Sequence, residues 1–257
     1  MKQAKCADDD NALSDPVKCG AQPVPHVSIV LPVHEEAGGL ARLFAELVPV
    51  LDALAADVEI VAVDDGSRDA TPALLRRLAA GDPRIRVVTL DARAGQGPAL
   101  AAGFAAARGT LVVTLDADGE NDPAESPRLR AAGAGYACCF GYRVGRRDGL
   151  HRRLGSRLAN GLRRLLLGDE IRDAGCGLKV LPASRARHLP AVRNMHLFMA
   201  NLPALRGASI AQFPVCHRPR LAGRSRYRGL TLLWTGLVDL MRLVGVRVTR
   251  TRYERCT

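Results

Sequence analysis

The sequence predicts an α/β fold in which a mostly parallel central sheet is flanked by helices. Strand-like and helix-like segments alternate four times between residues 26 and 118. The strand-like segments are continuously apolar, as in strands that are covered on both faces, rather than alternately apolar and polar. The length of 257 residues is sufficient for one large domain with a full hydrophobic core.

The first half of the chain carries the regular part of this pattern. Strands are expected at residues 26–33, 58–65, 84–90 and 110–118, and helices at 40–56, 71–81 and 97–109. Thr71 and Pro72 form an N-cap and first-turn pair, and Gly81 ends the same helix. We expect Pro49 to kink the helix that contains it.

The second half is less regular. We expect strands at 136–140 and 208–219, and between them a basic amphipathic helix at 152–168. The stretch at 229–248 is apolar and helical in pattern, with a single tryptophan and few charges. It is expected either to pack in the core or to lie along a membrane surface. No window of about 18 apolar residues suggests a transmembrane helix.

The charge is strongly positive and unevenly distributed. The formal net charge is +11, almost all basic residues are arginines, and they gather after residue 142 while the acids lie mainly before residue 126. Arginine binds phosphate through a planar fork, so this excess suits phosphate-bearing partners, although a GC-rich genome explains it equally well. The cysteines form no CxxC pair and no secretory segment follows Met1, which favours a reducing cytoplasm.

Acidic residues follow two of the expected strands. Asp64 and Asp65 come after the second strand, and Asp116 and Asp118 after the fourth. Ligands of open parallel sheets bind beyond the carboxyl ends of the strands. An Asp–x–Asp pair there can hold Mg²⁺ or Mn²⁺ and leave coordination positions for phosphate oxygens. The alternative, solvated aspartates that cap turns, explains either pair alone better than it explains both together.

Four motifs carry a resemblance to a known family. They read VSIVLPVHEEAGGL, VAVDDGSRDAT, ARAGQGPALAAGF and TLDADGENDP. In order and spacing, over about residues 26–140, they resemble glycosyltransferase family 2, which has the GT-A fold. The segments around 141–180 and 217–240 resemble the polyprenyl-phosphate glycosyltransferases of the dolichol-phosphate mannose synthase type and extend the similarity to about residue 245.

The resemblance implies a set of donor and metal residues. Nucleotide-sugar binding is implied for Pro32, Val33, His34, Glu36, Asp64, Asp65, Gly95, Gly97 and Asp116. Mg²⁺ or Mn²⁺ binding is implied for Asp116, Asp118 and Glu120, and a catalytic role for Asp116, Asp118 and Asp173. Three departures change the chemistry: His34 stands where the family usually has Tyr, Glu35 where it has Asn, and Glu120 where it often has Gln.

The resemblance also implies an acceptor site. Arg143, Arg152 and Ser156 match the positions that hold the acceptor phosphate, and the last two lie four residues apart on one face of the expected helix. A phosphate nucleophile is already ionised, so transfer is mainly a matter of positioning and electrostatics, without a dedicated base. Displacement at the sugar would invert its anomeric centre.

Further residues match the family more weakly. Asp173, Cys176 and Lys179 fall in a motif near its active site, and for Cys176 a packing role is favoured over a reactive thiol. His196 and His217 are expected to contact the diphosphate or to make structural hydrogen bonds. Arginines after the last expected strand could clamp the donor diphosphate or meet anionic headgroups, on a loop that closes over the donor: Arg218, Arg220, Arg224 and Arg226.

We therefore expect an inverting, metal-dependent glycosyltransferase. It would move a sugar from a GDP- or UDP-sugar to undecaprenyl or dolichyl phosphate for cell-envelope glycan assembly, as a peripheral enzyme at the inner face of the cytoplasmic membrane. Residues 1–24 would be a flexible lead-in, 25–228 the catalytic domain and 229–257 an amphipathic, membrane-associated helix and tail. The sugar, the nucleoside and the isoprenoid length stay open.

Two other functions are weighed against this one. A family 2 enzyme acting on a saccharide hydroxyl, in lipopolysaccharide or capsule synthesis, needs a carboxylate base, for which Asp173 is the candidate. A basic nucleic-acid-binding protein is disfavoured because the chain has few aromatic side chains for stacking, with only 4% Phe, Trp and Tyr.

Overall fold

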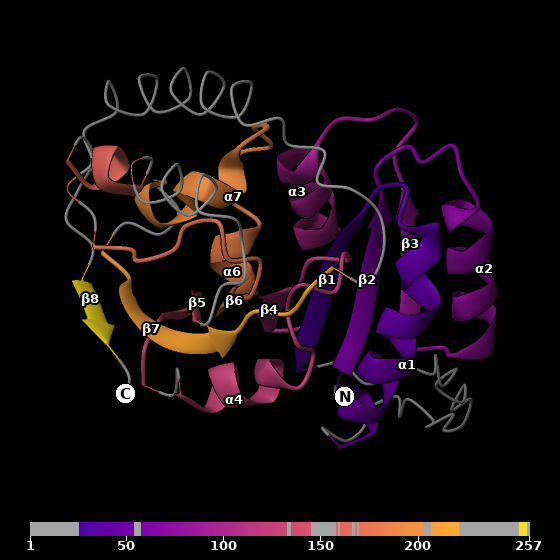
Figure 1. Cartoon of the computed structure of the whole chain (residues 1–257), viewed down its shortest axis with the longest axis horizontal. Coiled ribbons are helices and arrows are strands. Elements are labelled where there is room, and N and C mark those ends of the chain that lie inside the picture. Colours follow the sequence, from indigo (N-terminus) through magenta and orange to yellow (C-terminus); the bar gives the residue numbers. More distant parts are fainter. Residues whose placement is uncertain are drawn as a thin grey trace, which may run out of the picture.

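The structure is a computed structural model in which helices cover both faces of one sheet (Figure 1). It describes residues 26–53, 58–132, 135–144, 158, 160–165, 168, 170–202, 207–220 and 252–255. The expected lead-in at 1–24 and the apolar stretch at 229–248 lie outside these residues. About half of the expected basic helix at 152–168 also lies outside them, and its described residues 158 and 160–165 are helical. Within the described part of the chain, no helix has the length and apolar character needed to cross a membrane.

The sheet has eight strands in the order β3-β2-β1-β4-β6-β5-β7-β8. Their bounds are β1 Val27–Val33, β2 Val58–Asp64, β3 Ile85–Thr89, β4 Leu111–Thr114, β5 Cys138–Val144, β6 Lys179–Pro182, β7 Ser209–Cys216 and β8 Arg252–Arg255. All neighbours pair in parallel except β6, which runs antiparallel to both β4 and β5. The predicted α/β class with a mostly parallel sheet is thereby confirmed.

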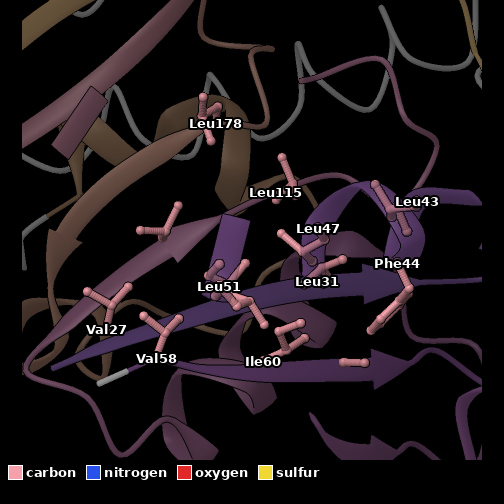
Figure 2. Close-up of a cluster of buried hydrophobic side chains, with 14 of the residues drawn as sticks. Val27, Leu31, Leu43, Phe44, Leu47, Leu51, Val58, Ile60, Leu115 and Leu178 are labelled. Carbon is pink, nitrogen blue, oxygen red and sulfur yellow. The ribbon is translucent and has the colours of Figure 1, made fainter. Parts of the chain in front are cut away.

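Helices lie on both faces of the sheet, and each face has its own apolar core. The bounds are α1 Ala37–Ala53, α2 Thr71–Gly81, α3 Gln96–Ala106, α4 Glu125–Ala132, α6 Ala183–Ala186 and α7 Met195–Phe198, with a 3₁₀ turn at Met199–Asn201. The leucines of α1 pack with Phe44 against alternate residues of β1 and β2 on one face (Figure 2). On the opposite face, α3 covers the other side chains of β1 and β2, α6 packs on β4 and β6, and α7 packs against α3.

Three local details differ from the sequence expectation. Thr71 is the first residue of α2 rather than its N-cap, because the Asp69 carboxylate accepts the Thr71 amide hydrogen bond and Ala70 occupies the cap position. Helix α1 begins at Ala37 and contains Pro49 within its length. Strand β4 ends at Thr114, so the acids of the Asp–x–Asp pair stand in the loop beyond it.

Strand β6 was not predicted, and it determines how the second half meets the first. It inserts between β4 and β5, with Lys179 paired to Thr114 on one side and to Phe140 on the other. The loop that precedes β6 therefore lies beside the end of β4. After β7, the chain returns to the same place, because His217 bridges to Asn121 and the Arg218 amide donates to the Glu120 carbonyl at 2.9 Å.

Candidate functional site

The acids at the carboxyl end of β2, Asp64 and Asp65, organise the loops around them. Asp65 is 4% exposed, and its carboxylate accepts hydrogen bonds from the amides of Ala94 at 2.6 Å and Gly95 at 2.9 Å. The neighbouring Asp64 is 1% exposed and accepts from the Ser67 amide at 3.1 Å. Both predicted nucleotide-binding acids thus fix backbone at the carboxyl ends of the strands.

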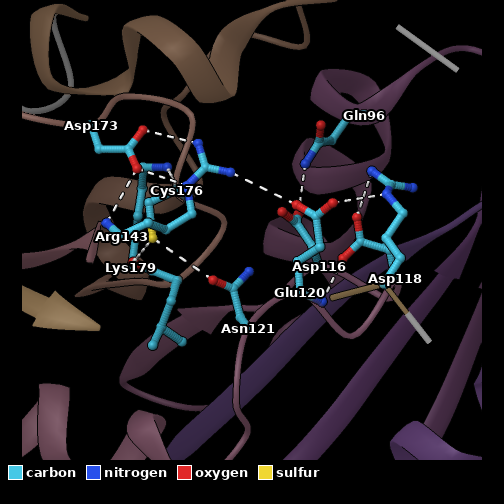
Figure 3. Close-up of polar contacts among 11 residues, drawn as sticks. Gln96, Asp116, Asp118, Glu120, Asn121, Arg143, Asp173, Cys176 and Lys179 are labelled. Carbon is cyan, nitrogen blue, oxygen red and sulfur yellow. Dashed lines mark hydrogen bonds and ion pairs between the residues drawn. The ribbon is translucent and has the colours of Figure 1, made fainter. Parts of the chain in front are cut away.

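The loop held by Asp65 leads directly to the second pair of acids. Gln96 is the first residue of α3, and its Nε2 donates to Asp116 Oδ1 at 2.8 Å (Figure 3). Gln96 was absent from the predicted site. Its only signal in the sequence is its position between Gly95 and Gly97, and the contact with Asp116 spans 20 residues. The two acidic strand ends are therefore joined through residues 94–96.

The surroundings of Asp116 and Asp118 disfavour the ionised form of both carboxylates. Burial, followed by repulsion from Asp118, raises the pKa of Asp116 to about 7. Burial and the nearby Glu120 also raise the pKa of Asp118 above its usual range. Both shifts mean that the site favours additional positive charge next to these carboxylates.

Arginine side chains reach the same acids from the second half of the chain. Arg220, in the segment after β7, lies 2.8 Å from Asp118 through Nη2 and 2.8 Å from Glu120 through Nε. Arg143, on β5, lies 3.8 Å from the other oxygen of Glu120 through Nη1. Glu120, a predicted metal ligand, is therefore an ion-pair partner of two arginines in this structure (Figure 3).

Asp173 holds Arg143 from the side opposite Glu120. Its Oδ2 accepts from Arg143 Nε at 2.7 Å and from the Arg143 amide at 3.2 Å, and its Oδ1 accepts from Nη2 at 3.0 Å. Asp173 is 7% exposed. Such a two-pronged contact fixes the plane of the guanidinium. Of the predicted acceptor residues, Arg143 is thus rigidly placed beside the acids, whereas Arg152 and Ser156 lie outside the described residues.

A buried cation, Lys179, anchors the loop before β6. Lys179 is 2% exposed, and its Nζ donates to the carbonyls of Ala174 and Cys176. Burial lowers the pKa of Lys179, while Cys176 and Asp116 oppose the shift. The same loop approaches Asp116 closely: a Cβ on Gly177 would lie 2.2 Å from Asp116 Oδ2. Any side chain at position 177 would therefore displace the Asp116 carboxylate.

The glycines and residues of the first motif also lie at this edge. Gly95 has φ 102°, which favours glycine, and a Cβ on Gly97 would lie 1.8 Å from the Val192 carbonyl oxygen. The close approach at Gly97 is therefore to the protein's own backbone. Pro32 and Val33 end β1, and the Glu36 amide donates to Thr71 Oγ1 at 3.0 Å. His34, one residue past β1, is partly buried.

Of the weaker candidates, Cys176, His196 and His217 lie within the described residues, whereas Arg224 and Arg226 do not. Burial raises the pKa of Cys176 to about 11 and, with the nearby Lys179, lowers that of His196 to about 3. Cys176 is therefore a protonated thiol that packs in the core. His217 makes a β-bridge with Asn121 and so connects the segment after β7 to the loop after β4.

The donor set at Asp116 and Asp118 suits a divalent metal ion. In the described ranges, no group of three or more His, Cys, Asp or Glu side chains stands ready as a metal site. Asp116 and Asp118 nevertheless combine hard oxygen donors with raised pKa values, and a bound cation would relieve the repulsion between them. Because Arg220 contacts Oδ2 of Asp118, a metal ion that binds this oxygen would have to displace that guanidinium.

Comparison with known proteins agrees with this arrangement. The model of the family described as "Glycosyl transferase family 2" matches residues 28–184. The chain belongs to glycosyl transferase family 2. The matched part of this family 2 chain runs from β1 to the beginning of α6 and contains Asp65, Asp116 and Arg143.

Several curated relatives of the family 2 chain share one name. The undecaprenyl-phosphate 4-deoxy-4-formamido-L-arabinose transferase of Edwardsiella ictaluri is 38% identical over 224 residues, which cover 85% of this chain and 67% of the relative. The protein of the same name from Pseudomonas paraeruginosa is 37% identical over 213 residues, covering 82% of this chain and 63% of the relative. The chain thus spans about two thirds of the length of these relatives.

Solved structures show the same fold. The glucosyl-3-phosphoglycerate synthase of Mycobacterium tuberculosis, in complex with Mn²⁺, UDP-glucose and phosphoglyceric acid, superposes with a TM-score of 0.67 at 24% identity and covers 89% of this chain and 82% of its own. A second mycobacterial protein gives a TM-score of 0.66 at 25% identity, with coverage of 89% and 76%. The predicted family and GT-A fold are both confirmed.

Proposed function

We propose that the protein transfers a sugar from a nucleotide-diphosphate sugar to the phosphate of a polyprenyl lipid. One observation carries the proposal. Arg143 is a partly buried guanidinium, oriented by Asp173, whose Nη1 faces the acidic edge formed by Asp116, Asp118 and Glu120. An oriented guanidinium next to a metal-binding pair of acids suits an acceptor phosphate next to a donor diphosphate.

On the donor side, Asp116 and Asp118 would hold Mg²⁺ or Mn²⁺. A divalent ion bound there would neutralise the diphosphate as it leaves the sugar. Gln96 and Gly177 keep Asp116 in place, through a hydrogen bond of 2.8 Å and through close packing. Structures of a protein with the same fold contain Mn²⁺ together with UDP or UDP-glucose, which supports testing these ligands.

On the acceptor side, the names of the curated relatives support undecaprenyl phosphate as the acceptor. Arg143 would bind its phosphate and direct an oxygen toward the anomeric carbon, with inversion. The phosphate is already ionised, so no residue has to remove a proton during the attack. The protein's task is to position two anionic groups that would otherwise repel one another.

Asp173 would orient Arg143 rather than act as a base. Both of its carboxylate oxygens accept hydrogen bonds from Arg143. A saccharide-hydroxyl acceptor would require Asp173 to take a proton, and the contact with Arg143 disfavours this role. The lipid phosphate is therefore the acceptor that the geometry supports better.

A lipid acceptor would require the protein to work at a membrane surface. The net charge of +11 suits anionic headgroups, and we propose a peripheral position at the cytoplasmic face. The proposed catalytic domain is 25–228, and 229–257 would contribute to membrane contact. Sedimentation with anionic vesicles, weakened at high salt, is the expected result. Equal sedimentation with neutral vesicles would contradict an electrostatic association.

The experiment for the proposed function is a transfer assay with competing acceptors. First, thermal-shift screening of UDP and GDP with Mn²⁺ identifies the nucleoside, because a bound ligand raises stability. The matching nucleotide-sugars are then offered with undecaprenyl phosphate or a soluble glycan. A lipid-linked product, absent with Asp118→Ala, is expected. A glycan product without lipid product would replace the proposed acceptor.

A further inference from the structure

Side chains of alternating charge form a continuous ladder across the site. From the acceptor side to the metal side, it contains Asp173, Arg143, Glu120, Arg220 and Asp118. Figure 3 labels Asp173, Arg143, Glu120 and Asp118. These five residues come from the loop before β6, from β5, from the loop after β4 and from the segment after β7. The contact between Arg220 and Glu120 spans 100 residues of sequence, so the ladder exists only in the folded chain.

Glu120 occupies the centre of the ladder. It is 9% exposed, and its two oxygens face different arginines: Oε1 lies 2.8 Å from Arg220 Nε, and Oε2 lies 3.8 Å from Arg143 Nη1. Arg143 uses its other two guanidinium nitrogens for Asp173. Arg220 uses Nη2 for Asp118. Each arginine therefore divides its charge between Glu120 and one outer carboxylate.

We propose that Glu120 is a positioning residue that couples the binding of the two substrates. The inference rests on the proposed function, because it assigns the metal–nucleotide to the Asp118 end and the acceptor phosphate to the Arg143 end. A glutamine at position 120 would carry no charge and only one oxygen, so it could not pair with both arginines and could not couple the two sites.

The contacts determine the sign of the coupling. A phosphate bound to Arg143 competes with Glu120 for the positive charge of that guanidinium, which leaves Glu120 to attract Arg220 more strongly. Arg220 then withdraws from Asp118 and exposes the carboxylate to a metal ion. In the reverse direction, a metal ion at Asp118 shifts Arg220 onto Glu120 and leaves Arg143 available for phosphate. Each ligand thus strengthens the binding of the other, as reciprocity requires.

The coupling is measured by calorimetric titration of the full chain. UDP or GDP, whichever binds, is titrated in Mn²⁺ with and without saturating geranyl phosphate, a short soluble isoprenyl phosphate. The dissociation constant of the nucleotide should fall about fivefold when geranyl phosphate is present, a coupling in the usual range. With Glu120→Gln, both ligands should still bind, and the ratio should fall to about one.

Two further variants make the result specific. Arg220→Met breaks the ladder at the next position and should also abolish the coupling, which keeps the test decisive if Glu120→Gln fails to fold. Glu46→Gln is the matched control. It removes a carboxylate that lies 2.8 Å from Arg218, which is in the same segment after β7 as Arg220 but is not part of the ladder. Its coupling should equal that of the unaltered protein.

The outcomes separate the inference from the function on which it rests. If the nucleotide and geranyl phosphate bind independently in the unaltered protein, or if Glu120→Gln retains the full ratio, Glu120 does not couple the sites and the proposed function is unaffected. If neither ligand binds at all, the proposed function itself is overturned.

Discussion

Asp173 grips the Arg143 guanidinium through both carboxylate oxygens, at 2.7 Å to Nε and 3.0 Å to Nη2. The plane of Arg143 is therefore fixed before any ligand arrives. This preorganisation distinguishes a side chain that binds a phosphate in one orientation from a surface arginine that only attracts it.

Loss of the contact between Asp173 and Arg143 should weaken binding of the acceptor and not of the donor. Asp173→Asn keeps the size of the side chain and removes its charge, so Arg143 loses its orientation. We expect the KM for the lipid phosphate to rise roughly tenfold, equivalent to about 1.4 kcal/mol, while the KM for the nucleotide-sugar changes little. Steady-state kinetics with each substrate varied in turn provides the measurement. A large loss of kcat at unchanged acceptor KM would instead assign Asp173 to proton transfer.

Gly177 should be needed for metal binding. In Gly177→Ala the new methyl group would lie 2.2 Å from the position that Asp116 Oδ2 now occupies, so the carboxylate must turn away. We expect Mn²⁺ affinity in the presence of nucleotide to fall by about tenfold or more, with the fold retained because a side chain and not backbone is displaced. Gly81→Ala is the matched control, since a Cβ there meets nothing within 4 Å. Equal metal affinity in both variants would separate Asp116 from the metal.

The acidic edge should make stability depend on pH. The pKa of Asp116 in the folded protein is about 7, above the ordinary 3.8. Between these two pH values, Asp116 is therefore protonated in the folded protein and ionised in the unfolded chain. In the absence of metal, this contribution to stability falls as pH rises from about 4 to about 7 and is constant above that range.

Asp116→Asn should remove this dependence. Melting temperatures of the unaltered protein and the variant, measured without metal from pH 5 to 8, should diverge as the pH rises, with the variant the more stable at pH 8. The exposed Asp91, changed to Asn, serves as the control for a general effect of charge. Parallel curves for Asp116→Asn and the unaltered protein would show that Asp116 does not titrate in this range.

Lys179 should be essential for the loop before β6. Lys179→Met leaves the carbonyls of Ala174 and Cys176 without their donor and removes the buried cation near Asp116. We expect a loss of about 3 kcal/mol in the free energy of unfolding, measured by urea denaturation. Arg76→Met, an exposed cation on α2, should change this free energy by less than about 0.5 kcal/mol. Similar losses in both variants would contradict a specific role for Lys179.

The sequence predicted the fold class because its signals are local. The apolar strands β1, β2 and β3 and the helices between them are visible as short patterns, and the acids at their ends follow from the direction of the strands. Strand β6 was missed because it has only four residues, Lys179–Pro182, one of them a lysine, and its antiparallel pairing depends on distant partners.

The site was predictable in part for the same reason. Asp65 directly follows β2, and Asp116 and Asp118 lie in the loop that follows β4, so their positions could be inferred from spacing. The contact of Gln96 with Asp116 and that of Arg220 with Glu120 could not, because they depend on how the loops cross the sheet edge. Glu120, an expected metal ligand, illustrates this: its charge can be read from the sequence, but its contacts with two distant arginines cannot.

The measurement that tests the account most directly is product analysis after incubation with a nucleotide-sugar, Mn²⁺ and undecaprenyl phosphate. Mass spectrometry should find a polyprenyl phosphate carrying one sugar, together with an equal amount of nucleoside diphosphate, and Asp118→Ala should form neither. Release of free sugar without any lipid-linked product, or undiminished product from Asp118→Ala, would contradict the account.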